Sequence, residues 1–158
     1  MMNKSCKLCW TISALSVVLV AAMAWMFLIK GNVTDSDDGR TAIVLTAGER
    51  DIVLAEMRGF LESVQGITEG LAKKDLALIG ENARKAGMAN VQGVPTTLMG
   101  KLPMAFKSLG METHKAFDAL AAESRDMMDQ QVILERLGEL MLNCTSCHSG
   151  YRIDIEKS

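Results

Sequence analysis

Residues 129–152 read DQQVILERLGELMLNCTSCHSGYR. Apolar side chains recur at three- and four-residue steps along this stretch, which predicts an amphipathic helix that starts near Asp129. The predicted stripe comprises Ile133, Leu137, Leu140, Met141, Cys144, His148 and Tyr151. The stripe ends in the pattern C-x-x-C-H, so a helix of the core carries two thiols and an imidazole at its C-terminal end.

The pattern C-x-x-C-H of residues 144–148 is the attachment signature of a c-type haem. On a helix, Cys144 and His148 are four residues apart and share a face, with Cys147 beside them. One helical turn can therefore bond the porphyrin edge through both sulfurs and present the imidazole to the iron. We predict one covalently attached haem c with His148 as the proximal iron ligand.

Other readings of the motif have less support. A structural zinc site usually needs four protein ligands, and the chain offers only one other histidine, His114, and the distant pair Cys6 and Cys9. A thioredoxin-like redox pair would need a βαβ context, which the sequence does not contain. A free or disulfide-bonded cysteine pair stays open as the plain alternative.

Composition points to helices and away from nucleic acid. The chain has 158 residues, twelve of them Met, only two Pro, and 4% aromatic residues. Leu, Met, Ala and a bound porphyrin can fill a core that lacks aromatic rings. Alternating Val and Ile residues are scarce, so an all-α fold is expected. With a net charge of −2, the chain lacks the excess of basic residues that is typical of nucleic-acid-binding proteins.

Residues 10–29 (WTISALSVVLVAAMAWMFLI) form an uncharged apolar run of the length that a membrane-spanning helix needs. Lys4 and Lys7 precede the run and acidic residues follow it. The positive-inside rule then places residues 1–9 in the cytoplasm and the main domain outside it. We expect a single-pass anchor in a bacterial inner membrane, with the haem domain in the periplasm.

A cleaved secretory signal is the competing interpretation of this run. Ala22-Met23-Ala24 resembles a small-x-small cleavage site. The apolar run continues beyond it to Ile29, which favours an uncleaved segment. Cys6 and Cys9 form a second C-x-x-C, but Trp10 follows where a haem site needs His, so they are expected to be thiols beside the membrane, open to acylation.

Residues 30–42 are polar and predict a linker, and residues 43–158 predict the folded domain. Thr46 and Glu49 fit a capping box that starts a first helix, and Asp75 fits the cap of a second. A third region contains Pro103 and Gly110 and becomes a firm helix over about 112–125. With the helix from residue 129, these elements predict an antiparallel four-helix bundle behind the membrane helix.

With these features the chain resembles the cytochrome c′ family. The resemblance rests on the motif's place in the fourth helix and on its extension to C-x-x-C-H-x-x-Y-R through Tyr151 and Arg152. It implies an up-down-up-down bundle, His148 as proximal ligand and, in many members, a homodimer. The membrane anchor and the Pro103–Gly110 segment depart from the pattern of many relatives.

The resemblance leaves two functions open, which differ in the residue on the distal side of the haem. Low-spin relatives place a Met of the first helix on the iron and carry electrons, whereas members with an apolar distal residue bind NO or CO. Met57 is the candidate ligand and Leu54 the rival distal residue, with Phe60 also expected against the porphyrin. A second imidazole from His114 is a weaker alternative, because its polar neighbours predict a solvated helix start.

Arg152 could pair with a haem propionate, and Tyr151 is expected to pack on the porphyrin. Arg50 and Arg58 are alternative propionate partners. No distal His/Arg pair suited to O–O cleavage is present, so the chain is not expected to be an enzyme. The leading hypothesis is an electron-transfer cytochrome that serves redox partner proteins of a respiratory chain, with NO/CO binding as the alternative.

Overall fold

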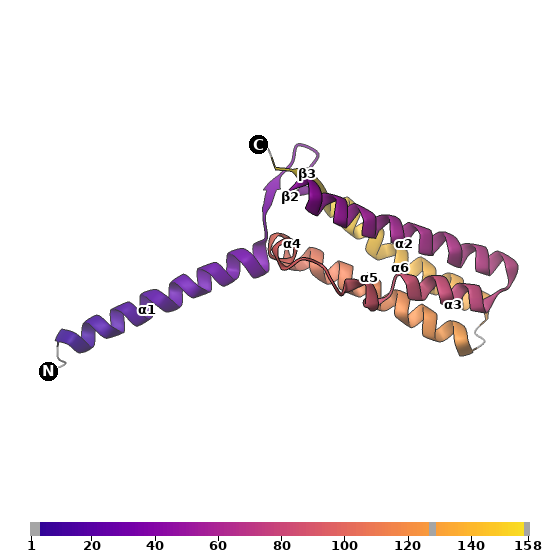
Figure 1. Cartoon of the computed structure of the whole chain (residues 1–158), viewed down its shortest axis with the longest axis horizontal. Coiled ribbons are helices and arrows are strands. Elements are labelled where there is room, and N and C mark those ends of the chain that lie inside the picture. The colour runs from indigo at the N-terminus through magenta and orange to yellow at the C-terminus, as the bar shows by residue number, and fades with distance from the viewer. Residues whose placement is uncertain (1–3, 127–128, 157–158) are drawn as a thin grey trace.

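The computed structural model describes residues 4–126 and 129–156. Helix α1 (Lys4–Ala24) continues into one turn of π-helix, η1 (Trp25–Lys30), and projects away from the rest of the chain (Figure 1). Over Leu8–Lys30 this helix is apolar, unburied and long enough to cross a membrane. Such an exposed apolar N-terminal helix is consistent with a membrane anchor or a signal sequence.

Four longer helices form the body of the protein. They are α2 (Ala47–Lys73), α3 (Leu76–Lys85), α5 (Met104–Glu123) and α6 (Gln130–Gly150). Helix α2 packs on α3, α3 on α5, α5 on α6, and α6 on α2. The chain reverses direction from each of these helices to the next (Figure 1). Three short helices lie between them: η2 (Met88–Val91), α4 (Thr96–Lys101) and η3 (Ser124–Asp126).

Local capping explains where three of these helices begin. The Thr46 hydroxyl accepts a hydrogen bond from the Glu49 N–H (3.3 Å), and the Glu49 carboxylate accepts one from the Thr46 N–H (2.9 Å). Asp75 accepts from the Leu78 N–H at 2.9 Å, and Asp129 caps α6. These side chains satisfy backbone donors that the helix itself leaves unpaired. The predicted starts of the first, second and fourth helices are confirmed.

The prediction of an all-α fold is wrong in one respect, because three strands form a small sheet. Strand β2 (Thr41–Leu45) lies between β1 (Val33–Asp35), antiparallel to it, and β3 (Tyr151–Ile155), parallel to it. The helix that carries the C-x-x-C-H motif therefore ends at Gly150, and Tyr151 begins a strand. Branched and aromatic side chains favour extended backbone in both paired segments. The sheet also orders much of the segment expected to be a linker.

The third helix is longer than expected. Helix α5 starts at Met104, directly after Pro103, and Gly110 lies inside it. The prediction that His114 is solvated is wrong as well, since its side chain is 3% exposed. The polar neighbours Glu112 and Lys115 lie on other faces of the helix, so sequence proximity misled the interpretation.

Buried apolar residues form two clusters, one toward each end of the helices. The first gathers around Phe117 where α2, α3, α5 and α6 meet. The second, here called the sheet-end cluster, consists of Ile43, Leu45, Val53, Leu98, Leu102 and Phe106. In Figure 1 the sheet, into which α6 leads through β3, lies beside the end of the apolar N-terminal helix.

Several contacts fix the end of the apolar N-terminal helix, and the residues that follow it, to the domain. The Asn32 N–H donates to the Lys101 carbonyl at 2.7 Å, and the Asn32 amide donates to the Val44 carbonyl at 2.9 Å. The Lys107 ammonium donates to the Leu28 carbonyl at 3.0 Å. Gly31 makes the bend with φ of 68°, in the left-handed region that favours glycine.

Candidate functional site

A cavity of about 170 Å³ lies where α2, α6 and the sheet meet. Its lining includes seven of the residues singled out from the sequence: Arg50, Leu54, Met57, Cys147, His148, Tyr151 and Arg152. Arg40, Phe106 and Ile153 complete it. Residues that are up to about a hundred positions apart thus converge around the C-x-x-C-H motif.

The motif occupies the last turns of α6. Cys144 and Cys147 are half-buried free thiols, and His148 is exposed. Burial raises the pKa of both thiols, and a charge on Cys144 would raise that of Cys147 further. Both sulfurs therefore stay protonated near neutral pH, and a protonated thiol is less reactive toward oxidants than a thiolate.

The opposite wall of the cavity comes from α2. Leu54 and Met57 are both half-buried there. The Met57 and Cys147 side chains pack against the same sheet-end cluster, to which Leu54 does not belong. A thioether from α2 and a thiol from α6 therefore approach one shared region of the core.

Phe60 lies outside this cavity. Its ring stacks on Phe117, with centroids 5.6 Å apart, and lies 4.8 Å from the ring of His114. Phe60 instead lines a second, larger cavity. The structure therefore does not bring Phe60 together with the motif.

Both ring nitrogens of His114 are engaged. Nδ1 lies 2.7 Å from the Ala86 carbonyl oxygen and Nε2 lies 2.9 Å from Oε1 of Glu56. Since both partners are acceptors, the ring donates twice and carries a positive charge. Burial lowers the pKa of His114, but the bonds to Glu56 and Ala86 outweigh it and raise the pKa. This imidazole has no nitrogen left for an iron.

Three arginines surround the cavity. Arg152 donates to Asp154 at 2.8 Å and pairs with Asp38 at 3.3 Å. Arg40 pairs with Asp38 at 2.6 Å and donates to the carbonyl oxygens of His148 and Tyr151 at 3.4 and 3.5 Å. These contacts hold the backbone of the motif's last turn against the sheet.

Arg50 differs from the other two, since it has no ion pair among the residues that the structure describes. It is thus the guanidinium best placed to receive a carboxylate from a ligand in this cavity. Arg58 is exposed and does not line the cavity. The sequence predicts Arg152 as a propionate partner. A propionate would have to compete with Asp38 and Asp154 for this guanidinium.

Sequence reasoning missed Arg40, Phe106 and Ile153. The Phe106 ring meets the Tyr151 ring edge-on, with centroids 5.4 Å apart. These residues reach the site through the sheet and through α5, and no local pattern marks them. A hint was available for Ile153 in the alternation of Tyr151, Ile153 and Ile155.

The donor set fits a c-type haem. Two free thiols and an exposed imidazole lie in one helical turn, and Met57 of α2 lines the cavity together with Cys147 and His148. At about 170 Å³ the cavity is smaller than the roughly 300–1,000 Å³ of pockets that enclose drug-sized ligands. A porphyrin bonded to both cysteines would therefore lie partly over the exposed His148 or displace neighbouring side chains. Within the described ranges, no group of three or more His, Cys, Asp or Glu residues is placed to hold a metal ion.

No family model matches the chain, and neither the curated proteins nor the solved structures contain a match to it. The site must be interpreted from its own geometry.

Proposed function

We propose that the chain is a membrane-anchored monohaem c-type cytochrome that transfers electrons. The observation that carries the proposal is the shared cavity, in which Cys147 and His148 of the C-x-x-C-H motif meet Met57 and Leu54 of α2. Two thiols and an imidazole at this spacing suit covalent haem attachment with one axial ligand. The redox partners would be proteins of a respiratory chain.

The arrangement of helices supports the cytochrome c′ type within that class. Helices α2, α3, α5 and α6 pack in sequence order around one core and reverse direction at each step. On this proposal they form an antiparallel four-helix bundle, with the cofactor between its first and last helices. The three-stranded sheet would be an addition at the haem end of that bundle.

The motif and most of the residues that line the cavity would have a role under this proposal. Cys147, together with Cys144, which does not line the cavity, would hold the porphyrin edge. His148 would be the proximal ligand, and the Met57 thioether would be the distal one. A bound haem supplies a one-electron iron couple, whose potential a thioether ligand raises. Tyr151 and Phe106 exclude water from one side. Arg50 and Arg152 receive the propionates.

A five-coordinate haem that binds NO or CO is the second candidate. It is favoured by Leu54, which lines the same cavity one helical turn from Met57. An apolar distal side chain would leave one iron position open to a small gas. Leu54 and Met57 therefore decide between an electron carrier and a gas-binding module.

The exposed apolar helix supports the location. Leu8–Lys30 would hold the protein in a bacterial inner membrane by a single span, with the haem domain in the periplasm, where c-type haem is attached. Fixed contacts between the end of this helix and the domain would keep the haem close to membrane-bound partners.

The visible spectrum of the protein, expressed together with a haem-attachment system, tests the proposal. Six-coordinate ligation predicts a low-spin ferric spectrum with a Met–iron band and slow, weak CO binding to the reduced form. A high-spin spectrum with rapid CO binding would support the gas-binding alternative. Absence of any haem after acid–acetone extraction would reject both.

A further inference from the structure

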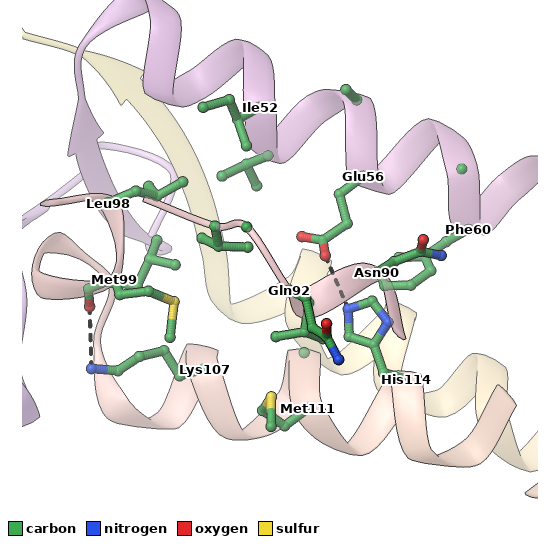
Figure 2. A pocket seen from close by; sticks show the side chains of 18 of the residues that line it. Ile52, Glu56, Phe60, Asn90, Gln92, Leu98, Met99, Lys107, Met111 and His114 are labelled. Carbon is green, nitrogen blue, oxygen red and sulfur yellow. Dashed lines mark hydrogen bonds and ion pairs between the residues drawn. The ribbon is translucent and has the colours of Figure 1, made fainter. Parts of the chain in front are cut away.

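A second cavity of about 440 Å³ lies between α2, α5 and the segment 86–103 (Figure 2). Its volume falls within the roughly 300–1,000 Å³ of pockets that bind small molecules. The lining is mainly apolar, with Ile52, Leu98, Met99 and Met111 around it. Phe106 is the one described residue that lines both this cavity and the haem-site cavity.

Two glycines inside helices keep this cavity open. Gly59 of α2 and Gly110 of α5 both line it. A Cβ atom at either position would meet no other heavy atom within 4 Å, so close packing does not require glycine there. A glycine inside a helix costs roughly 0.5–1 kcal/mol relative to alanine. The space that these two residues leave is the cavity itself.

One wall presents a hydrogen-bond acceptor. Oε1 of Glu56 accepts from the charged ring of His114, and the other carboxylate oxygen has no hydrogen bond to any residue that the structure describes. Figure 2 shows Glu56 and His114 reaching toward each other from α2 and α5. An ionised carboxylate accepts and cannot donate, so a complementary ligand must bring a donor.

The charge at the Glu56 wall disfavours an anion there. Lys85 pairs with Glu81 at 3.2 Å, and Lys107 donates to the Met99 and Leu28 carbonyl oxygens. Lys107 keeps its positive charge because these two acceptors are neutral, but the free oxygen of Glu56 would repel a negative ligand at its own wall. An uncharged molecule with a hydroxyl group can donate a hydrogen bond to Glu56 without the charge repulsion that a carboxylate or a phosphate would meet there.

The position of Lys107 suggests where such a molecule comes from. Lys107 lines the cavity and bonds the Leu28 carbonyl near the end of the apolar N-terminal helix. We propose that this cavity binds an uncharged apolar molecule taken up from the membrane, whose hydroxyl group donates to the free oxygen of Glu56. The site is separate from the haem site and adjoins it through Phe106.

Binding of 2-naphthol to the haem-loaded full-length protein in detergent, measured by calorimetry, tests this site. We expect 2-naphthol to bind, 2-methoxynaphthalene to bind at least about tenfold more weakly because it lacks the donor, and 2-naphthoate not to bind. Equal affinity for the hydroxyl and methoxy compounds would overturn the role of Glu56.

Cavity-filling variants locate the binding. Gly110→Phe should abolish binding, and Gly59→Leu provides a second block from the other helix. Gly138→Phe is the matched control, because Gly138 also lies inside a helix, meets no atom within 4 Å and does not line the cavity. An unchanged haem spectrum verifies folding of each variant. Unaltered binding in both cavity-filling variants would overturn the proposal.

Two further arms separate the alternatives. If 2-naphthol binds the haem-free Cys144→Ala/Cys147→Ala protein but not the haem-loaded protein, the porphyrin occupies this cavity and the separate site is wrong. To test whether the ligand comes from the membrane, organic extracts of the variants purified from membranes are compared by mass spectrometry. A hydroxylated neutral lipid should accompany Gly138→Phe but not Gly110→Phe, and its absence from both would overturn uptake from the membrane.

Discussion

Met57 of α2 and Cys147 of α6 pack against the same buried cluster and line the same cavity. Helix α6 carries the C-x-x-C-H motif and α2 lines the same cavity, so a haem bonded to Cys147 would have the Met57 thioether within its reach. Leu54 lines the cavity but does not pack on the cluster. This relationship favours Met57 as the second iron ligand.

Replacing Met57 by Leu is therefore expected to convert a low-spin haem to a high-spin one and to open the iron to CO. The Leu side chain keeps the apolar contacts and removes only the ligand sulfur, so covalent haem attachment should persist. Leu54→Ala, with its ligand set intact, should retain the Met–iron band. The reverse pattern, with Met57→Leu spectrally silent, would assign the distal position to Leu54.

Gly31→Ala should destabilise the junction between the anchor and the domain. Gly31 has φ of 68°, and an added Cβ would lie 2.5 Å from the Lys101 carbonyl oxygen and 2.7 Å from the Pro103 nitrogen. Both the strained backbone and the clash with other backbone atoms predict a loss of about 2 kcal/mol or more. Chemical denaturation of the full chain in detergent measures it. An unchanged midpoint would contradict the described junction.

Gly110→Ala should have the opposite effect. Gly110 lies inside α5 with open space at its Cβ position, so alanine adds helix propensity without a clash. The free energy of unfolding should rise by about 0.5–1 kcal/mol. Thermal unfolding measures this directly. A destabilised variant would show that the cavity beside Gly110 is closed in solution.

The buried His114 should make stability depend on pH. Because its pKa is raised in the folded protein, the charged form favours folding at pH values below its ordinary pKa of 6.5. This contribution is lost as the pH rises through the folded value. The destabilisation caused by His114→Phe should therefore be larger at pH 5.5 than at pH 9, as denaturant titrations at both pH values would show. An equal effect at both values would mean that folding does not raise the pKa of the ring.

The sequence predicted local features better than distant pairings. Thr46 and Asp75 were recognisable as helix caps, and Asp129 as the start of the fourth helix, because these signals depend on neighbouring residues. The pairing of Thr41 with Tyr151 was not, since it joins segments about a hundred residues apart that carry only short β-like patterns.

In the candidate site, too, local features could be predicted from the sequence and distant contacts could not. The spacing of Cys144, Cys147 and His148 follows from one helical turn, and the apolar stripe of α2 pointed to Met57. Arg40 directly precedes β2 and reaches the motif only because β2 pairs with β3 at the end of α6. The burial of His114 depends on Glu56 and Ala86 from other elements, which no local pattern reveals.

Covalent attachment of a haem to Cys144 and Cys147 is the central claim, and the intact mass of the purified protein tests it most directly. Co-expressed with a haem-attachment system and denatured in acid, the chain should be heavier than its sequence by one haem, and Cys144→Ala/Cys147→Ala should lose this addition. A protein with the mass of its unmodified polypeptide and no haem retained through acid–acetone extraction would contradict the account.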